Sequence, residues 1–466
     1  MQLNTQSIDS LFHPIPFDTL LPPLTEVMTP PANRLIDLVS THYPSIEPTL
    51  SLPAHVRQAV RMMTMCHSSA LGGHVECCPN GHINRIFYNS CGHRFCPRCA
   101  SRIRLKWLLD REPKLFPVRH YHTIFTLPHT FNALWHLNPQ VMGDLLFHSG
   151  VDALKALLAD PHRLGAEVGI TVTLETWDDR MHFHPHLHCL VTGGGLTPEN
   201  EWVDVANPRC LVAVKPLMWE FRKRFCQGLK QLLFDGVLTL PENMTQRQWS
   251  LRLKKANRLK WSVFISKQPE NGGPTPANIL RYQAENVAGG PLSGDRLLTK
   301  QSELSAAQLA YLKSSPLSES RLDFAPEGMV SFYWGNYDSA TGKRERTQIE
   351  TLPATEFLRR YLQHVSPSGY QTVRHYGLYA GTMKTAYERC ADLLSDRQPP
   401  PMPEEANDES RYDNESWVSD HTCSVSGEPL IVTKHLPSTR TGQVIPRPPL
   451  GPVAIRPPTQ GGFHAS

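Results

Sequence analysis

Apolar residues recur every three or four positions in several stretches of the chain, and this period predicts amphipathic helices. The predicted helices are Arg34–His42, Ala54–Cys66, Ser101–Arg111, Leu134–Ala159, Leu217–Phe234, Pro276–Asn286, Pro353–Val365 and Thr382–Leu394. Short runs of β-branched, aromatic and alternating residues predict strands instead. These are Ile83–Asn89, Arg119–Leu127, Val168–Trp177, Met181–Val191, Trp261–Ser266, Val330–Tyr337 and Arg344–Leu352. Helices and strands therefore alternate along the chain.

The stretch Met181–Gly195 carries four alternating histidines, His182, His184, His186 and His188. Side chains alternate across a strand, so all four are expected on one face. The preceding strand, Val168–Trp177, is expected to form a hairpin with this one. Two imidazoles two residues apart can bind one divalent metal ion and leave coordination positions open for chemistry. A half-buried strand with a solvated polar face is the alternative interpretation.

The cysteines are concentrated in one short segment. Of the 11 cysteines, six lie between Cys66 and Cys99: Cys66, Cys77, Cys78, Cys91, Cys96 and Cys99. This clustering indicates a metal site in a reducing compartment rather than a disulfide scaffold. Cys96 and Cys99 form a C-x-x-C turn suited to zinc, and Cys78 with His82 is expected to supply the matching half. Cys91 is a ligand or a buried thiol, and reduced core cysteines are the alternative for the whole set.

The length and the net charge of the chain place broad limits on the class of protein. The 466 residues allow two or three domains, and the net charge of +4 neither requires nor excludes a nucleic-acid partner. The chain contains no apolar run of membrane-spanning length and no signal-peptide pattern, so we expect a soluble cytoplasmic protein without a membrane partner.

Basic residues suited to DNA phosphates occur in two places. They are Arg102 in one predicted helix, and Lys254, Lys255, Arg258, Lys260 and Lys267 near the predicted strand Trp261–Ser266. Trp261 or Phe264 could stack on bases beside these cations. A solvated helix face and a core strand explain the same composition equally well.

In the helix that begins at Pro276, Tyr282 by itself would be interpreted as a packed aromatic residue.

Five segments, taken together, resemble the rolling-circle transposases of the insertion-sequence-ninety-one family, in the His-hydrophobe-His (HUH) superfamily. The segments are Leu71–Cys99, His122–His129, His182–Leu196, Ile279–Leu298 and Phe357–Ala380, in the family's order. The resemblance covers roughly residues 54–394. It implies an α+β protein with a zinc-binding module and an HUH catalytic domain with an antiparallel sheet and flanking helices. The C-terminal tail falls outside the resemblance, and its Pro-rich, charged composition predicts that it is disordered.

The resemblance also implies roles for individual residues. His186 and His188 match the pair that binds the catalytic Mg²⁺ or Mn²⁺, and Tyr282 matches the nucleophile. Cys78, Cys91, Cys96 and Cys99 match cysteines of the structural zinc module, to which we add His82 by inference. The implied reaction is cleavage and rejoining of single-stranded DNA at transposon ends and targets. Asn286 stands where many members have a second tyrosine, so the chain resembles a single-tyrosine variant of the family.

The expected domains are an extended arm (1–33), a zinc-binding domain (34–111), a catalytic domain (112–300), a C-terminal part of the transposase domain (301–394) and a disordered Pro-rich tail (395–466). The third ligand of the catalytic metal stays open among Asn286, Gln283, Glu285 and His184. Two other functions compete with that of a transposase. One is a replication-initiator or relaxase-like nickase, and the other is a zinc-dependent DNA-binding protein that has lost catalysis.

Overall fold

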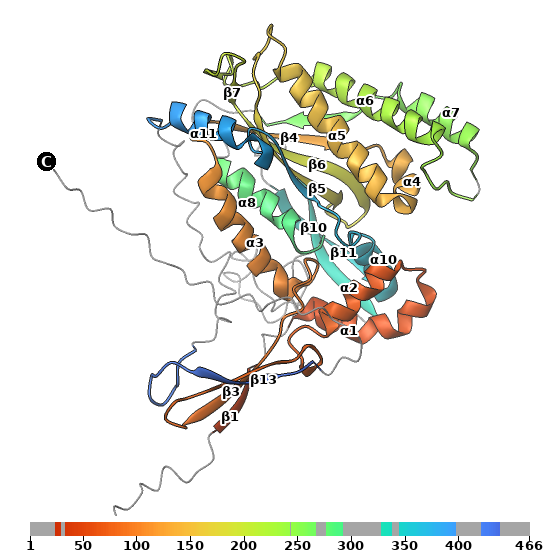
Figure 1. Ribbon diagram of the computed structural model, residues 1–466. Coiled ribbons are helices and arrows are strands. Elements are labelled where there is room, and N and C mark those ends of the chain that lie inside the picture. The colour runs from red at the N-terminus through yellow and green to blue at the C-terminus, as the bar shows by residue number, and fades with distance from the viewer. Residues whose placement is uncertain are drawn as a thin grey trace, which may run out of the picture.

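The computed structural model describes residues 24–28, 33–242, 244–266, 276–291, 328–337, 344–397 and 421–438. Within these residues the protein is a mixed α+β structure built around a five-stranded antiparallel sheet (Figure 1). Among the described helices, none combines the length and the apolar character needed to cross a bilayer. The expected α+β class is confirmed.

The central sheet has the order β12-β5-β6-β4-β9. Its strands are β12 (Val373–Gly377), β5 (Gly169–Trp177), β6 (Phe183–Thr192), β4 (His120–Thr126) and β9 (Ser262–Ile265). β5 and β6 form the predicted hairpin. In its turn, the carboxylate of Asp178 accepts hydrogen bonds from the backbone N–H groups of Arg180 and His182, at 2.9 and 2.8 Å. An Asx turn of this kind satisfies the backbone where the ladder ends.

The sheet is covered on both faces, and its two faces carry different chemistry. Leu187, Cys189 and Val191 of β6 point into the main apolar core. On that side lie α4 (Asn132–Leu137), α5 (Pro139–Leu158), α6 (Val214–Phe234) and α7 (Gln246–Ala256). Leu190 points the other way and packs against α8 (Pro276–Val287) and α3 (Pro97–Arg111). Figure 1 shows α8 and α3 on the side of the sheet opposite α5 and α6.

A second sheet forms the N-terminal module, with the order β1-β3-β2-β13. Its strands are β1 (Leu24–Met28), β2 (Gly73–Cys77), β3 (Ile83–Tyr88) and β13 (Ile431–Leu436). β1 comes from the segment expected to be an extended arm, and it pairs in parallel with β3. β13 comes from the segment expected to be a disordered tail, and it pairs antiparallel with β2. Pairing between segments so distant in sequence leaves no local signal, which is why neither strand was predicted.

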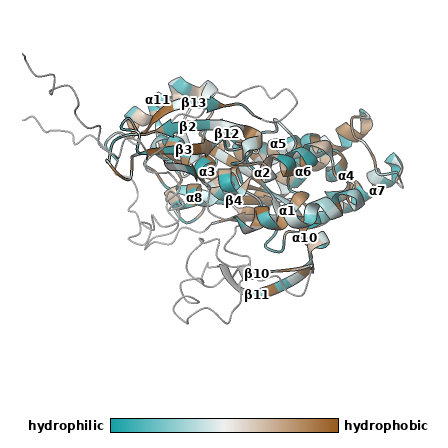
Figure 2. Cartoon of the chain, turned by 90° about the horizontal axis from the view of Figure 1, so that it is seen from below, coloured by the Kyte–Doolittle hydropathy of each residue, from teal (hydrophilic) through white to brown (hydrophobic). Residues whose placement is uncertain are grey.

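A second core joins the N-terminal module to the rest of the protein. It contains α1 (Arg34–Ile46), α2 (Ala54–Thr64) and α10 (Ala354–Leu362), together with the hairpin of β10 (Met329–Tyr337) and β11 (Arg344–Pro353). The hairpin extends away from the body in Figure 2. Glu350 on β11 binds Arg180, in the β5–β6 turn, at 2.8 Å and Arg360 on α10 at 3.0 Å. The turn of the histidine hairpin is thus fastened to this second core.

The remaining described elements are short. They are β7 (Gly194–Leu196), β8 (Trp202–Asp204), α11 (Lys384–Leu393) and the 3-10 helices η2 (Glu47–Thr49), η3 (Ser69–Leu71), η4 (Glu112–Lys114), η5 (His129–Phe131) and η8 (Gly381–Met383). Two details differ from the predictions. The helix expected over Leu134–Ala159 divides at Asn138, because Pro139 starts a new helix. The glycines after β6 continue as β7, whose backbone lies against that of Val203 too closely for a side chain at Gly194.

Candidate metal centre, nucleophile and zinc-binding cluster

Three side chains that can bind a metal ion meet on the face of the sheet covered by α8. They are Glu175 on β5 and His186 and His188 on β6, and their ligand atoms all lie within 4.8 Å of one another. Glu175 pairs directly across from His186. One oxygen of Glu175 lies 3.1 Å from Nε2 of His188, and the other lies 3.7 Å from Nε2 of His186. Two imidazoles and a carboxylate on one face suit a divalent cation with coordination positions left open.

In His186 and in His188 the other ring nitrogen, Nδ1, has a hydrogen-bonding partner, and this directs Nε2 toward Glu175. Nδ1 of His186 donates to the carbonyl of His184 at 2.7 Å, and Nδ1 of His188 lies 2.8 Å from Nε2 of His122. Metal-binding histidines commonly have such partners, because these fix the orientation and tautomer of the ring. Burial lowers the pKa of His186 to about 4 and that of His122 to about 3. The ring of His186 is therefore neutral at pH 7, which is the form that binds a metal ion.

Tyr282 on α8 lies directly over this cluster. Its ring contacts the ring of His188 edge-on, at 5.1 Å between centroids, and that of His122 at 5.6 Å. The next residue, Gln283, is fully buried and ties the helix to the sheet. Its side-chain N–H group donates to the carbonyl of His188 at 2.9 Å and to that of Thr171 at 3.2 Å. The hydrogen bonds of Gln283 thus hold Tyr282 close to His188 of the histidine pair.

Glu175 was missed among the open candidates for a third metal ligand. Among the described residues, neither Glu285 nor His184 belongs to the group that contains His186 and His188. Glu285 is exposed, Gln283 binds backbone carbonyls, and the ring of His184 lies against that of His129. The available signal was a single carboxylate in the otherwise apolar and hydroxylated strand VGITVTLETW.

The four alternating histidines do not act as one group. His182 lies in the turn before β6, where its Nδ1 contacts the carboxylate of Asp178 at 2.9 Å. His184 contacts the rings of His129 and His186, whereas His186 and His188 are the two of the four that form a group with Glu175. The expectation of one shared face is correct within β6, and the turn takes His182 out of it.

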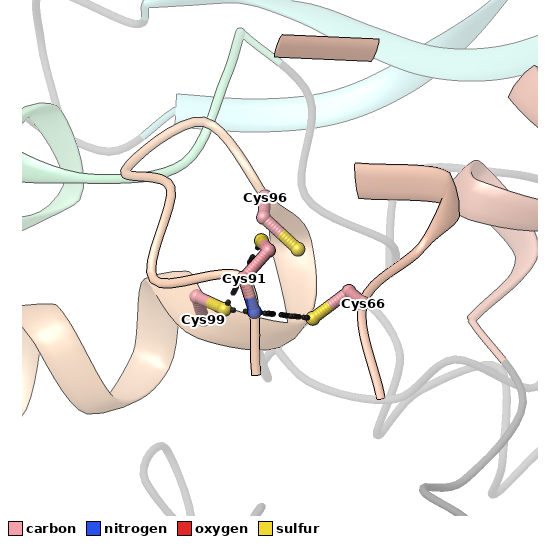
Figure 3. Close-up of side chains that lie close together, drawn as sticks. All are labelled: Cys66, Cys91, Cys96 and Cys99. Carbon is pink, nitrogen blue, oxygen red and sulfur yellow. Dashed lines mark hydrogen bonds between the residues drawn. The ribbon is translucent and has the colours of Figure 1, made fainter. Parts of the chain in front are cut away.

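The main cysteine cluster consists of Cys66, Cys91, Cys96 and Cys99, drawn in Figure 3. Sγ of Cys99 lies 3.7 Å from Sγ of Cys66 and 3.6 Å from Sγ of Cys91. Four thiolates at 2.3 Å from one zinc ion would be about 3.8 Å apart at tetrahedral angles. The cluster therefore fits a closed, structural zinc site.

The ligand set of this cluster differs from the sequence-based one. Cys66, at the C-terminal side of α2, takes the place expected for Cys78 and His82. Cys66 comes just before β2 and Cys91 just after β3, whereas Cys78 and His82 lie in the β2–β3 turn at the other end of the hairpin. Five residues of strand span about 17 Å, so one ion cannot bind both groups. Sequence spacing alone could not distinguish the two ends of the hairpin.

Of the basic residues expected to bind DNA, those that the structure describes are exposed and lie on different sides of the sheet. Arg102 lies on α3, which packs on α8 and so belongs to the side of the metal cluster. Lys254 and Lys255 lie on α7, which packs on α6 across the sheet. Arg258 and Lys260 follow α7, before the edge strand β9. Lys267 lies outside the described residues.

Of the two aromatic residues considered for stacking, one is buried. Trp261 is 2% exposed, and its indole N–H donates to the carbonyl of Ala256. It belongs to the core, so its proposed contact with bases is wrong. Phe264 is 44% exposed. It pairs with Ile124, which pairs with His188, so Phe264 shares the face of the metal cluster.

Comparison with known proteins identifies the class. The model of a transposase zinc-binding domain matches residues 38–127, and that of a putative transposase matches residues 169–309 and 299–386. The first match contains the four-cysteine cluster, and the second contains Glu175, His186, His188 and Tyr282. A zinc-binding module followed by this sheet and site therefore defines a transposase.

Two relatives narrow the family. A putative transposase, y4qJ of Sinorhizobium fredii, is 31% identical over 394 residues, which are 82% of this chain and 90% of that protein. The transposase for insertion sequence element IS801 of Pseudomonas savastanoi pv. phaseolicola is 26% identical over 350 residues, 74% of this chain and 76% of that protein. No solved structure matches. The chain belongs to the insertion-sequence-ninety-one family of transposases.

Proposed function

We propose that this transposase cleaves and rejoins single-stranded DNA through a covalent bond between Tyr282 and the 5′ phosphate. The observation that carries the proposal is the edge-on contact of Tyr282 with His188, one of three metal-binding side chains gathered on a buried sheet face. A nucleophile beside a group of this composition is what phosphodiester cleavage requires. The protein would act on transposon ends and targets inside the cell.

The chain's own residues have distinct tasks in this reaction. The phenolic oxygen of Tyr282 loses its proton and attacks the phosphorus. The bond from phosphorus to the 3′ oxygen breaks, and that oxygen takes up a proton. The products are a 5′-phosphotyrosine and a free 3′-hydroxyl, and attack by a 3′-hydroxyl reverses the step and releases the tyrosine. The phosphodiester count is unchanged throughout, so no external energy source is needed for rejoining.

Glu175, His186 and His188 would hold a Mg²⁺ or Mn²⁺ ion. The donor set fits such an ion, since it combines a hard carboxylate oxygen with neutral imidazole nitrogens. A cation bound there would neutralise charge that develops on the phosphate oxygens. Gln283 sets the position of α8 relative to the cluster. With Asn286 in place of a second tyrosine, one subunit can hold one DNA end covalently at a time.

Labelled single-stranded oligonucleotides, incubated with Mg²⁺ or Mn²⁺ and run on a denaturing gel with and without protease, test the proposal. A slowly migrating band that protease removes is expected for the wild type. Tyr282→Phe and Glu175→Ala should lose the band and retain single-strand binding. Tyr88→Phe, which alters a half-buried tyrosine on β3 outside the central sheet, should retain both.

The outcomes separate the competing functions. A band of wild-type intensity in Tyr282→Phe would refute the assignment of the nucleophile. Binding without a covalent band, on oligonucleotides that carry the element's own ends, would instead favour a DNA-binding protein without catalysis. Cleavage without joining to a second strand would favour a nickase.

A further inference from the structure

A second group of metal-binding side chains lies at the tip of the N-terminal module, in the β2–β3 turn. It consists of Cys78 and His82 from that turn and Cys423 from the C-terminal segment, with all three ligand atoms within 4.8 Å of one another. Nδ1 of His82 lies 3.7 Å from Sγ of Cys78 and 3.7 Å from Sγ of Cys423. The zinc-binding family model ends at residue 127 and the transposase model at residue 386, so Cys423 lies beyond both matches.

These distances match one tetrahedral ion. With Zn–S at 2.3 Å and Zn–N near 2.05 Å, a sulfur and a nitrogen bound to the same zinc are separated by about 3.6 Å. Cys78 and Cys423 are 4% and 2% exposed, so both sulfurs are shielded from water. His82 closes the group from the exposed side.

Two similar turns face each other across this group. After Cys78, the chain turns so that the N–H of Gly81 donates to the carbonyl of Cys78 at 2.9 Å, and φ of Gly81 is +75°. After Cys423, the N–H of Gly427 donates to the carbonyl of Cys423 at 2.8 Å, with φ of +73°. Glycine is needed in both places because other residues rarely adopt such φ values. Each cysteine is thus presented at the start of a tight turn.

The fourth side of the group is occupied by a hydroxyl. Ser426 lies three residues after Cys423, the spacing of the second cysteine in a C-x-x-C zinc turn. Its Oγ lies 3.5 Å from Sγ of Cys78. The two turns therefore bring two sulfurs, one nitrogen and one hydroxyl oxygen close together.

The strand that follows is held by its pairing with β2, and the same segment has a contact of 2.7 Å between His421 and Glu76. It buries little apolar surface. Along β13 the side chains are exposed from Ile431 to His435, with Ile431 and Val432 52% and 51% exposed. Near the turns, buried apolar contact is limited to a small cluster of Cys78, Ile83, Cys423 and Leu430. An edge strand with few buried contacts is marginal by itself. Metal binding supplies free energy directly to folding, so one ion could hold the whole segment.

We propose that Cys78, His82 and Cys423 bind a second structural zinc ion, separate from the four-cysteine site, which fastens residues 421–438 to the N-terminal module. Closing the site joins parts of the chain that lie 341 residues apart. The protein then carries two structural zinc ions, at opposite ends of the β2–β3 hairpin.

The test is the zinc content of the full-length protein, measured by elemental analysis after purification without added metal. Cys423→Ser and Cys78→Ser should each contain one zinc ion per chain fewer than the wild type. The matched control is Cys210→Ser, because Cys210 is exposed and belongs to none of the metal-binding groups among the described residues. It should keep the wild-type content. Any ion at the candidate catalytic site is common to all variants and cancels in these differences.

Hydrogen exchange of the backbone amides supplies a second measurement. In Cys423→Ser, amides of residues 431–436 should exchange faster while those of α3, next to the four-cysteine site, stay as in the wild type. Such a pattern would show that the variant is folded. Unchanged zinc content in both Cys423→Ser and Cys78→Ser would overturn the proposal.

Ser426→Cys tests the same geometry by adding a zinc ligand rather than removing one. A cysteine at this position would complete a four-ligand site, so zinc should leave more slowly when the protein is mixed with a coloured chelator. Release at the wild-type rate, together with unchanged zinc content in Cys423→Ser, would indicate that the turns pack without metal.

Discussion

Replacing Gln283 by methionine removes the side chain that ties α8, the helix of the candidate nucleophile Tyr282, to the sheet. Gln283 donates to the carbonyls of His188 and Thr171, at 2.9 and 3.2 Å, and it is fully buried. Methionine has a similar volume and no hydrogen-bond donor, so it fills the site without either bond. Tyr282 keeps its chemistry and loses the contact that fixes its height above His188.

The magnitude follows from the number of bonds lost. A hydrogen bond between neutral groups contributes about 1 kcal/mol net, so two bonds contribute about 2 kcal/mol. If all of this free energy positions Tyr282, the rate of covalent complex formation should fall about 30-fold. Binding of single-stranded DNA should change much less, since Gln283 is inaccessible to a ligand.

The assay is single-turnover formation of the protease-sensitive DNA–protein band, with single-strand affinity and thermal unfolding measured on the same preparations. Glu285→Ala, an exposed position on the same helix, is the control and should behave as the wild type. A wild-type cleavage rate in Gln283→Met would refute the positioning role. A fall in cleavage and affinity by the same factor, with lower thermal stability, would show that Gln283 serves folding alone.

Two further predictions address DNA binding and pH. Phe264→Ala should weaken binding of single-stranded DNA by about 5- to 150-fold, the range for one lost stacking contact of 1–3 kcal/mol, whereas Phe234→Ala, 80% exposed on the opposite helical layer, should bind normally in a fluorescence anisotropy titration. Equal effects of the two variants would count against a base-stacking role for Phe264. Burial lowers the pKa of His364 to about 4. Its contribution to stability is therefore complete above pH 6.5 and is lost as pH falls toward 4, by about 3 kcal/mol in total. His364→Gln should show a correspondingly smaller loss of unfolding free energy in urea between pH 7 and 4.5, and an unchanged loss would contradict the assignment.

Much of the candidate site could be predicted because its signals are local. The alternation that places His186 and His188 on one face is a property of any strand, and a helix starting at Pro276 carries Tyr282 wherever it packs. The C-x-x-C turn of Cys96 and Cys99 is likewise complete within four residues. Strand period, helix period and turn geometry depend on neighbours in sequence, so the sequence is sufficient for them.

Which residues these local elements meet in the fold depended on contacts between segments that are distant in sequence. Glu175 joins the histidines through the register of a hairpin, which a bulge between Glu175 and Trp177 shifts by one residue. The same dependence on distant contacts placed α7 and its lysines on the face of the sheet opposite the metal cluster. Local periodicity carries no information about which faces are brought together.

The sequence by itself determined the class of protein, the histidine pair that is the candidate metal site, the cysteine-rich module and the helix with the candidate nucleophile. Only the tertiary structure decided which cysteines lie close enough to share an ion. It brought Cys66 to Cys91, Cys96 and Cys99, and it set Cys78 apart with Cys423. The physical reason is that a metal site needs ligand atoms within a few ångströms in space. Spacing along the chain sets that separation inside one turn, whereas packing sets it between elements.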